Sequence, residues 1–174
     1  MKKSIVSIFS TVVLSAFLVN GAQAQSLAEC LSTDIVDFDG SIVDAAIATP
    51  ELSTLVDAVV AAGLDEALAT TEDITVYAPT NDAFAALPGD VLNTIVGDVD
   101  LLTAVLTYHV TPGEQDPRRF TTAVRRNTLL KGQKVYYSRF GGAARVNQSA
   151  IACQGVQTDN GVVWVIDSVL IPQF

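Results

Sequence analysis

Several residue types are scarce in this chain of 174 residues. It has one histidine, His109, and two cysteines, Cys30 and Cys153. These numbers and spacings exclude a zinc site made of several cysteine and histidine ligands. Phosphate-binding loops, dinucleotide fingerprints, the calcium loop D-x-[DN]-x-[DN]-G and the hydrolase elbow G-x-S-x-G are also absent. No set of catalytic residues emerges, so we expect no enzyme activity, no metal and no cofactor.

Basic residues are missing from most of the chain. Residues 25–117 contain 17 acidic and no basic residues, whereas residues 118–145 contain eight basic and no acidic ones. Either the two regions neutralise each other within the fold, or the basic segment binds an anionic partner such as a glycan or the acidic half of another molecule. Nucleic acid is not an expected partner of so acidic a chain, and self-association remains open. The candidate anion-binding patch comprises Arg118, Arg119, Arg125, Arg126, Lys131 and Lys134.

Long apolar runs are confined to the N-terminus. Two lysines precede the uncharged run Ile5–Val19, and Ala22-Gln23-Ala24 forms a small-x-small cleavage site. This layout is typical of a secretory signal peptide. We expect residues 1–24 to be removed and residues 25–174 to fold as one domain, secreted to the periplasm or the cell surface. No later run reaches the ~20 apolar residues of a transmembrane helix.

The two cysteines both lie in the predicted mature chain. An even number of cysteines in an exported protein favours a disulfide bond, here between Cys30 and Cys153. A loop of that length would stabilise the fold by roughly 4–5 kcal/mol in the chain-entropy model. The alternative is lipidation of Cys30, because Leu27-Ala28-Glu29-Cys30 faintly resembles a lipid-attachment box.

Hydrophobic periodicity predicts helices in the first half of the chain. Apolar residues recur at helical spacing in segments 42–47, 52–60, 64–69, 83–87, 91–96 and 101–106. Ser41, the Thr80-Asn81-Asp82 triplet, and Asp98 or Asp100 are candidate N-caps. Gly63 suits the position just after a helix end.

The second half predicts strands. We expect strands at 74–77 and 108–110, followed by two hairpins formed by 134–140 with 144–148 and by 154–158 with 162–167. Gly141-Gly142 and Asp159-Asn160-Gly161 supply the hairpin turns. Helices followed by strands favour an α+β domain with helices packed on an antiparallel or mixed sheet.

Three segments together resemble one family. TVYAPTNDAF (residues 75–84) resembles the first signature of fasciclin-like domains, T-V-F-A-P-T-N-x-A-F. LTYHVTPG (residues 106–113) resembles their middle Tyr-His motif. GVVWVIDSVLIP (residues 161–172) resembles their second signature. The order and spacing match over nearly the whole predicted mature chain.

The resemblance implies a fasciclin-like fold, in which N-terminal helices pack on an antiparallel or mixed β-sheet wedge. It also implies a secreted, non-enzymatic module for adhesion or protein interaction, with a surface protein or a glycan of a cell or matrix as partner. In animal members the Tyr-His motif has been linked to integrin binding, which makes Leu106, Tyr108, His109 and Val110 the candidate interaction motif. The first signature supplies a structural motif of Thr75, Pro79, Thr80, Asn81, Asp82 and Phe84. The alternative function is binding of an apolar small molecule or lipid between helices and sheet.

His109 is open to several interpretations from sequence alone: catalytic base, metal ligand or buried hydrogen-bonding group. A buried neutral imidazole needs one hydrogen-bond acceptor and one donor. If the strands at 74–77 and 108–110 share one core, the turn at 79–82 lies within reach. We therefore expect Asn81, Asp82 or a backbone group of this turn to bind His109.

Overall fold

The computed structural model describes residues 27–120, 122–140 and 142–173. The predicted signal peptide, residues 1–24, lies outside the described residues, so its cleavage stays a prediction. The helices are α1 Leu27–Ser32, α2 Ile42–Ile47, α3 Ser53–Ala61, α4 Asp65–Thr70, α5 Asn81–Ala85, α6 Gly89–Gly97 and α7 Val99–Tyr108, with short 3-10 turns η1 Pro50–Leu52 and η2 Pro117–Arg119.

The described strands form one mixed sheet. Their order is β3-β2-β8-β7-β6-β5-β4, and β1 pairs with β7 outside this path. The β2–β8 and β1–β7 pairs are parallel, and the other pairs are antiparallel. The strands are β1 Val36–Asp37, β2 Ile74–Pro79, β3 Val110–Pro112, β4 Val124–Asn127, β5 Lys134–Phe140, β6 Ala143–Val146, β7 Ser149–Thr158 and β8 Gly161–Ile166. The first and last signatures therefore lie side by side in the middle of the sheet.

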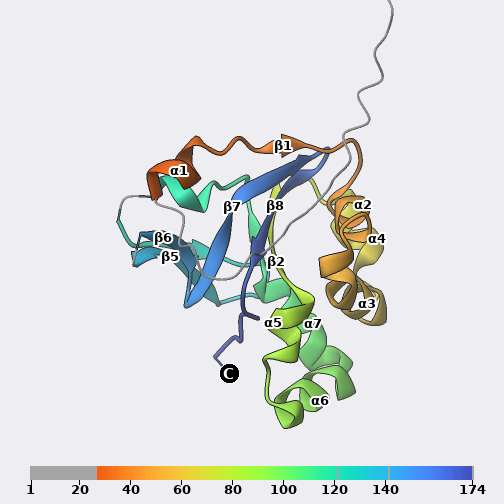
Figure 1. Ribbon diagram of the computed structural model, residues 1–174. Coiled ribbons are helices and arrows are strands. Elements are labelled where there is room, and N and C mark those ends of the chain that lie inside the picture. Colours follow the sequence, from red (N-terminus) through yellow and green to blue (C-terminus); the bar gives the residue numbers. More distant parts are fainter. Residues whose placement is uncertain (1–26, 121, 141, 174) are drawn as a thin grey trace, which may run out of the picture.

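Helices α2 to α7 cover one side of this sheet, whereas α1 lies beside β7 near the β5–β6 side. In Figure 1, α2, α3 and α4 cluster beside β2 and β8, α5 to α7 lie below them, and β5 and β6 extend to the opposite side. The prediction of an α+β domain with helices packed on a mixed sheet wedge is confirmed.

Local capping chemistry explains where the helices begin and end. Ser41 accepts a hydrogen bond from the Asp44 backbone, and the Asp44 carboxylate accepts one from the Ser41 backbone, which closes a capping box on α2. Thr80 caps α5 and Asp98 caps α7. Gly63 follows α3 with a φ of 63°, the left-handed conformation that ends many helices. These predicted caps are confirmed.

Several predicted strand boundaries differ from the observed ones, most notably those of β3 and β7. Helix α7 continues through Tyr108, and strand β3 begins only at Val110. Strand β7 begins at Ser149 rather than at residue 154, because Asn147 adopts a left-handed turn (φ 52°) that folds β7 back onto β6. Strand β4, which carries Arg125 and Arg126, was not predicted.

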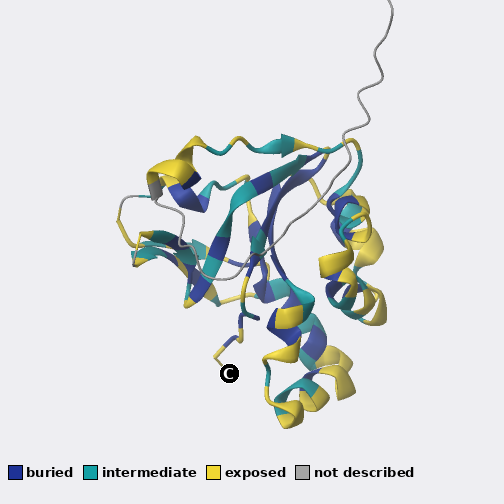
Figure 2. Ribbon diagram, in the orientation of Figure 1, coloured by how far each residue is buried: buried dark blue, intermediate teal, exposed yellow. Residues whose placement is uncertain are grey.

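Two apolar clusters hold the layers together. One lies between the helices and the sheet and includes Ile42, Leu55 and Leu102. The other centres on Trp164 and Tyr137 and lies on the β5–β6 side. Figure 2 shows β2 and β8 almost wholly buried between these clusters. This burial on both faces explains why the β8 sequence is apolar without alternation.

Candidate functional site

His109 is buried at the end of α7, with 2% of its surface exposed. The backbone N–H of Leu170 donates to its Nε2 at 2.9 Å, and its Nδ1 lies 2.8 Å from the carbonyl oxygen of Val105. Because Nε2 accepts, Nδ1 carries the proton and donates to Val105. Burial lowers the pKa of His109 to about 4, so the ring is neutral near pH 7. Backbone groups therefore occupy both nitrogens of the ring.

The predicted partners of His109 in the turn at 79–82 are not the observed ones. Its side chain instead binds its own helix and Leu170, which lies within the second signature. Contact with the first signature is made by the backbone, since the His109 carbonyl accepts from the Tyr77 N–H at 2.9 Å. His109 thus joins all three signatures as a structural residue.

The candidate interaction motif also needs correction. Leu106, Tyr108, His109 and Val110 are all buried, so none of them forms a surface that a partner can contact in this conformation. The Tyr108 hydroxyl donates to the Lys134 carbonyl at 3.0 Å and accepts from the Asn147 side chain at 3.0 Å. The motif thus joins α7 to strand β5 and to the turn between β6 and β7.

The neutral state of His109 makes stability depend on pH. The imidazole titrates near pH 6.5 in the unfolded chain and near 4 in the fold, so between these values the unfolded state binds the extra proton. As the pH falls through this window, protonation of His109 should lower the free energy of unfolding by roughly 3 kcal/mol. Urea unfolding of the wild type and of His109→Gln, which keeps a donor and an acceptor, should show their difference in stability shrinking as pH falls. Parallel pH profiles for the two proteins would contradict this assignment.

Two residues of the first signature fasten separate parts of the chain. The Thr75 hydroxyl donates to the Gly113 carbonyl at 2.7 Å, which ties β2 to the loop after β3. The Asn81 side chain accepts from the Thr54 N–H at 2.9 Å and donates to the Pro50 carbonyl at 3.0 Å. Asn81 therefore caps the start of α3 from a distant position in the sequence.

The other members of this motif have simpler roles. Pro79 and Phe84 are buried, and Thr80 accepts from the first turn of α5. Asp82 is exposed and is not the N-cap. The signature is thus mainly a device for joining β2, α3 and α5.

Asn160 does more than form the predicted hairpin turn. Its buried side chain accepts from the Ile42 N–H at 2.9 Å and donates to the carbonyl oxygens of Leu68 and Thr71 at 2.7 and 2.9 Å. It thereby satisfies backbone groups at the start of α2 and the end of α4. The next residue must be glycine, because a Cβ on Gly161 would lie 2.0 Å from a β2 carbonyl oxygen.

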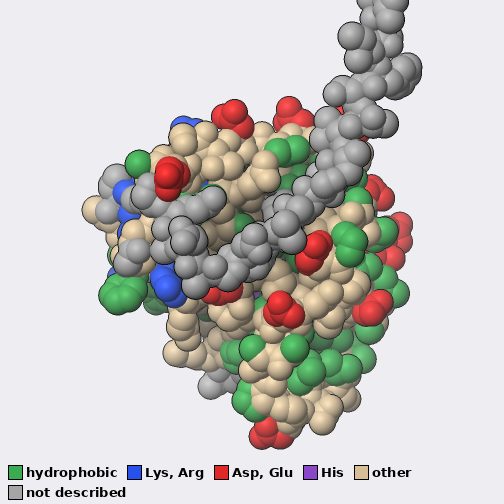
Figure 3. Space-filling view, in the orientation of Figure 1, with side chains coloured by type: hydrophobic (Ala, Val, Ile, Leu, Met, Phe, Trp, Pro, Cys, Tyr) green, Lys and Arg blue, Asp and Glu red, His purple; other side chains and the backbone are tan. Residues whose placement is uncertain are grey.

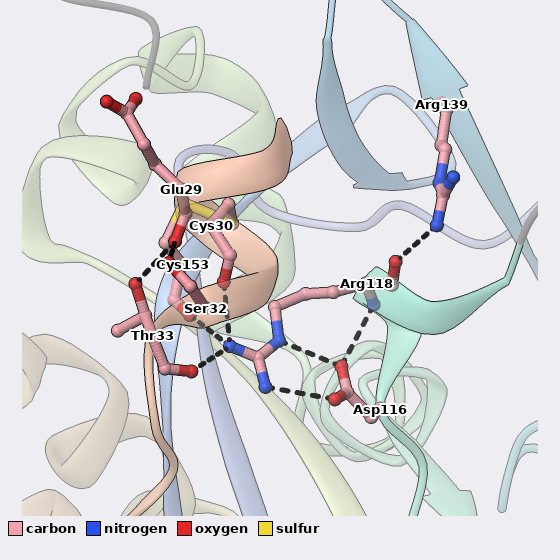
Figure 4. The surroundings of a disulfide bond; sticks show 8 residues. All are labelled: Glu29, Cys30, Ser32, Thr33, Asp116, Arg118, Arg139 and Cys153. Carbon is pink, nitrogen blue, oxygen red and sulfur yellow. Dashed lines mark hydrogen bonds and ion pairs between the residues drawn. A yellow bond between two sulfur atoms is a disulfide. The ribbon is translucent and has the colours of Figure 1, made fainter. Parts of the chain in front are cut away.

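The predicted disulfide bond between Cys30 and Cys153 is present. It ties α1 to β7 across a sequence separation of 123 residues. Because the disulfide bond occupies the Cys30 thiol, this thiol is not free for lipidation, which was the alternative. Figure 4 shows that Arg118 reaches into the space beside the disulfide.

Arg118 is a structural residue and not part of a surface patch, with 2% of its side chain exposed. Its Nη1 donates to the carbonyl oxygens of Cys30, Thr33 and Cys153 at 3.1, 2.7 and 2.6 Å (Figure 4). The guanidinium also lies 4.6 Å from the centre of the Trp164 ring. These contacts correct the prediction that Arg118 binds an external anion.

Asp116 neutralises the buried charge of Arg118. Its two carboxylate oxygens accept from Nε and Nη2 of Arg118, each at 2.9 Å. Burial alone would raise the pKa of Asp116, but the hydrogen bonds and charge of Arg118, helped by Arg119, hold it below its usual range. The pair is bidentate, the geometry that best compensates a buried guanidinium.

The remaining basic residues gather on β4, β5, β6 and the adjoining loops. Arg119, Arg125, Lys131 and Lys134 are exposed. Arg126 is half-buried, because it donates to the Gln115 side chain at 3.0 Å and lies over the Phe120 ring. Within the described residues, the ion pairs found join only Arg118 and Arg119 to Asp116.

Strand register places a set of these side chains together. Arg125 faces Tyr136 across β4 and β5, and Arg145 faces Ser138 across β5 and β6. Directly opposed residues share a face, and alternate residues of β5 continue it. We call Arg125, Lys134, Tyr136, Phe140 and Arg145 the basic outer face. In Figure 3 lysine and arginine lie at the β5–β6 side, while acidic side chains are spread over the top and the helical side.

A small apolar cavity lies between α2, α3 and the sheet. It is lined almost entirely by aliphatic side chains such as Val56, Val59 and Val76, together with His109, and its volume is ≈ 30 Å³. Ligand pockets usually measure about 300–1,000 Å³. The cavity in this conformation is therefore far smaller than a lipid site.

The helices and the acidic side chains bear on membranes and metals. Among the described residues, no single helix is long and apolar enough to cross a membrane, although α6 and α7, which are bent by 106° relative to each other, are so as a pair. The same residues contain no group of three or more histidine, cysteine or acidic side chains arranged to hold a metal ion.

Comparison with known proteins places this chain in a family. The sequence model described as "Fasciclin domain" matches residues 50–172. Protein sll1483 of Synechocystis sp. is 38% identical over 134 residues, which cover 76% of this chain and 73% of that protein. Immunogenic protein MPB70 of Mycobacterium bovis is 39% identical, over 56% of this chain and 49% of that protein.

Two more matches come from surface or adhesion proteins. Cell surface glycolipoprotein MPB83 of Mycobacterium bovis is 36% identical over 58% of this chain and 44% of its own length, so the chain spans about half the length of these mycobacterial relatives. A solved FAS1 domain pair from the insect cell adhesion molecule fasciclin I superposes with a TM-score of 0.56, at 17% identity, over 69% of this chain and 45% of that chain. With the family model covering most of its length, the chain belongs to the fasciclin domain family.

Proposed function

We propose that this protein is a secreted, non-enzymatic adhesion and interaction module that acts at the cell surface or in the extracellular matrix. The observation that carries the proposal is the basic outer face, whose cations are not paired with the acidic residues of the helices. A cationic surface on an otherwise acidic molecule attracts anionic partners locally. The partner is an anionic protein or glycan.

Two other observations support a binding role. The single histidine has both ring nitrogens occupied by backbone groups, so it is not available as a catalytic base. Relatives include a protein named as a cell surface glycolipoprotein and the fold neighbour fasciclin I, which is named as a cell adhesion molecule. Both names agree with work outside the cytoplasm.

Neutralising the basic outer face should weaken attachment. The variant Arg125→Gln/Lys134→Gln removes two exposed charges that form no ion pair with any residue in the described part of the chain. At about 1 kcal/mol for each cation near an anionic surface, attachment to cells or matrix should fall roughly 30-fold. The dependence of attachment on salt should also become shallower. Retention of the protein on intact cells over a range of salt concentrations measures both effects.

A matched control separates local charge from net charge. Ala61→Glu/Asn93→Asp makes the same change in net charge at exposed helical positions away from the basic outer face. This control should attach as well as the wild type. Equal attachment of the wild type and the Arg125→Gln/Lys134→Gln variant would overturn the proposed function.

The alternative function, binding of an apolar small molecule or lipid, draws its support from the cavity beside His109. A volume of ≈ 30 Å³ leaves room for little more than a water molecule. Helices α2 and α3 would have to move away from the sheet to admit an acyl chain. The basic outer face needs no such rearrangement, which is why adhesion is the function we propose.

A further inference from the structure

Two aromatic rings lie exposed on the basic outer face. Tyr136 is 48% exposed and Phe140 is 74% exposed. Burying such a ring on folding is favourable, and these two rings forgo much of that gain. Their neighbours in β5, Val135 and Tyr137, are fully buried, so the strand itself is well packed. The two exposed rings of β5 therefore both lie on its outward side.

Each exposed ring has an arginine beside it. The Arg125 guanidinium lies 5.9 Å from the centre of the Tyr136 ring, and that of Arg145 lies 5.8 Å from the centre of the Phe140 ring. Contacts of this kind are weakly stabilising at exposed sites. They also order the side chains before a ligand arrives, which lowers the entropic cost of binding.

Resting on the proposed function, we infer that the basic outer face binds an acidic polysaccharide. A sugar ring presents an apolar C–H face that stacks on an aromatic side chain, and a uronic acid adds a carboxylate at its edge. Tyr136 and Phe140 supply the stacking surfaces. The guanidinium groups of Arg125 and Arg145 supply charged donors for the carboxylates, although Nη1 of the half-buried Arg145 also donates to the Gln148 carbonyl. Lys134 adds a third cation.

The spacing of the rings calls for an extended ligand. Tyr136 and Phe140 are four residues apart on one strand, or about 13 Å at roughly 3.3 Å per residue. A monosaccharide cannot reach both rings, whereas a polymer lying along β5 can. At physiological ionic strength the Debye length is about 8 Å, so acidic side chains farther than this from the basic outer face repel such a polymer only weakly.

Two other anionic occupants fit this surface less well. Single-stranded nucleic acid is usually held in a basic groove, whereas this site is the outer face of a sheet with three cations. The acidic helices of a second copy offer carboxylates, but nothing in them requires the two exposed rings. The pairing of rings with arginines therefore favours a polysaccharide.

The test uses the full chain and immobilised polygalacturonate, a polymer of uronic acid. Wild-type protein should bind polygalacturonate and should not bind dextran, which has no charge. Tyr136→Ala/Phe140→Ala keeps every cation and should weaken binding about 10- to 30-fold, at roughly 1 kcal/mol for each stacked ring. Arg125→Gln/Arg145→Gln should weaken binding to a similar extent and flatten its salt dependence.

Matched controls and competing ligands decide between the occupants. Ile47→Ala/Val60→Ala removes two exposed apolar side chains from the helical side and should bind like the wild type. Unchanged binding by Tyr136→Ala/Phe140→Ala would overturn the inference. Tighter binding of a single-stranded oligothymidylate than of polygalacturonate would overturn it in favour of nucleic acid. Self-association of the wild type that disappears in both face variants, without polygalacturonate binding, would overturn it in favour of a second copy.

This inference and the proposed function fail in different ways. If Arg125→Gln/Lys134→Gln weakens attachment to cells but the wild type does not bind polygalacturonate, the polysaccharide assignment falls and the adhesive surface stands. If that variant attaches to cells like the wild type, the proposed function falls, whatever happens with the purified polymer.

Discussion

Replacing Arg118 with methionine is expected to lower the free energy of unfolding by about 3–5 kcal/mol. Methionine fills part of the space of the arginine stem but leaves the Asp116 carboxylate without its bidentate partner. It also leaves the carbonyl oxygens of Cys30, Thr33 and Cys153 without the donor that now binds them. Urea unfolding at pH 7, with the disulfide intact, measures the loss.

Arg119 provides the matched control for this prediction. It binds the same carboxylate at 3.0 Å, but 77% of its side chain is exposed. Arg119→Met should therefore cost less than about 1 kcal/mol. Arg118→Met/Asp116→Leu removes both members of the pair and should be less harmful than Arg118→Met alone, because no unpaired charge remains buried. Equal costs for Arg118→Met and Arg119→Met would contradict the structural role of Arg118.

Removing the disulfide is expected to cost about 4–5 kcal/mol. Cys30 and Cys153 close a loop with a sequence separation of 123 residues, and in the chain-entropy model a loop of that size restricts the unfolded chain strongly. The variant Cys30→Ala/Cys153→Ala should therefore unfold at a much lower urea concentration than the oxidised wild type. Wild-type protein treated with dithiothreitol should match the variant.

The disulfide and Arg118 should not act independently. Arg118 holds the carbonyl groups of both cysteines, so loss of the covalent bond also loosens its acceptors. Combining Arg118→Met with the two cysteine substitutions should cost less than the sum of the separate losses. A cost below 1 kcal/mol for Cys30→Ala/Cys153→Ala would show that the bond contributes little to the fold.

The sequence allowed accurate prediction where the determining chemistry is local. Ser41 and Thr80 cap helices through backbone groups three residues away, and Gly63 adopts the conformation that glycine tolerates best. The signatures identified the family and the fold because their order and spacing are distinctive. The disulfide could be predicted because the sequence contains only two cysteines, so only one pairing between them is possible.

The roles of Arg118 and His109 could not be predicted because their partners are distant in sequence. A run of arginines after a proline is usual on a surface, and only the fold brings Cys30 and Cys153 around Arg118. His109 finds its donor in Leu170, 61 residues away. The outward position of Tyr136 depends on pairing with β4, a strand that was not expected. Long-range packing settled each of these assignments.

The parallel pairing of β2 with β8 has a consequence for the order of folding. The register joins Ile74 to Gly161, so the middle of the sheet is assembled from segments that are synthesised far apart in time. Contacts of such high sequence separation are slow to form, because the intervening chain must first be brought to close quarters. Before β8 has been synthesised, one edge of β2 has no strand to pair with. His109 also lacks the hydrogen bond from Leu170 at that stage. The fold is therefore completed only after β8 and Leu170 have been synthesised.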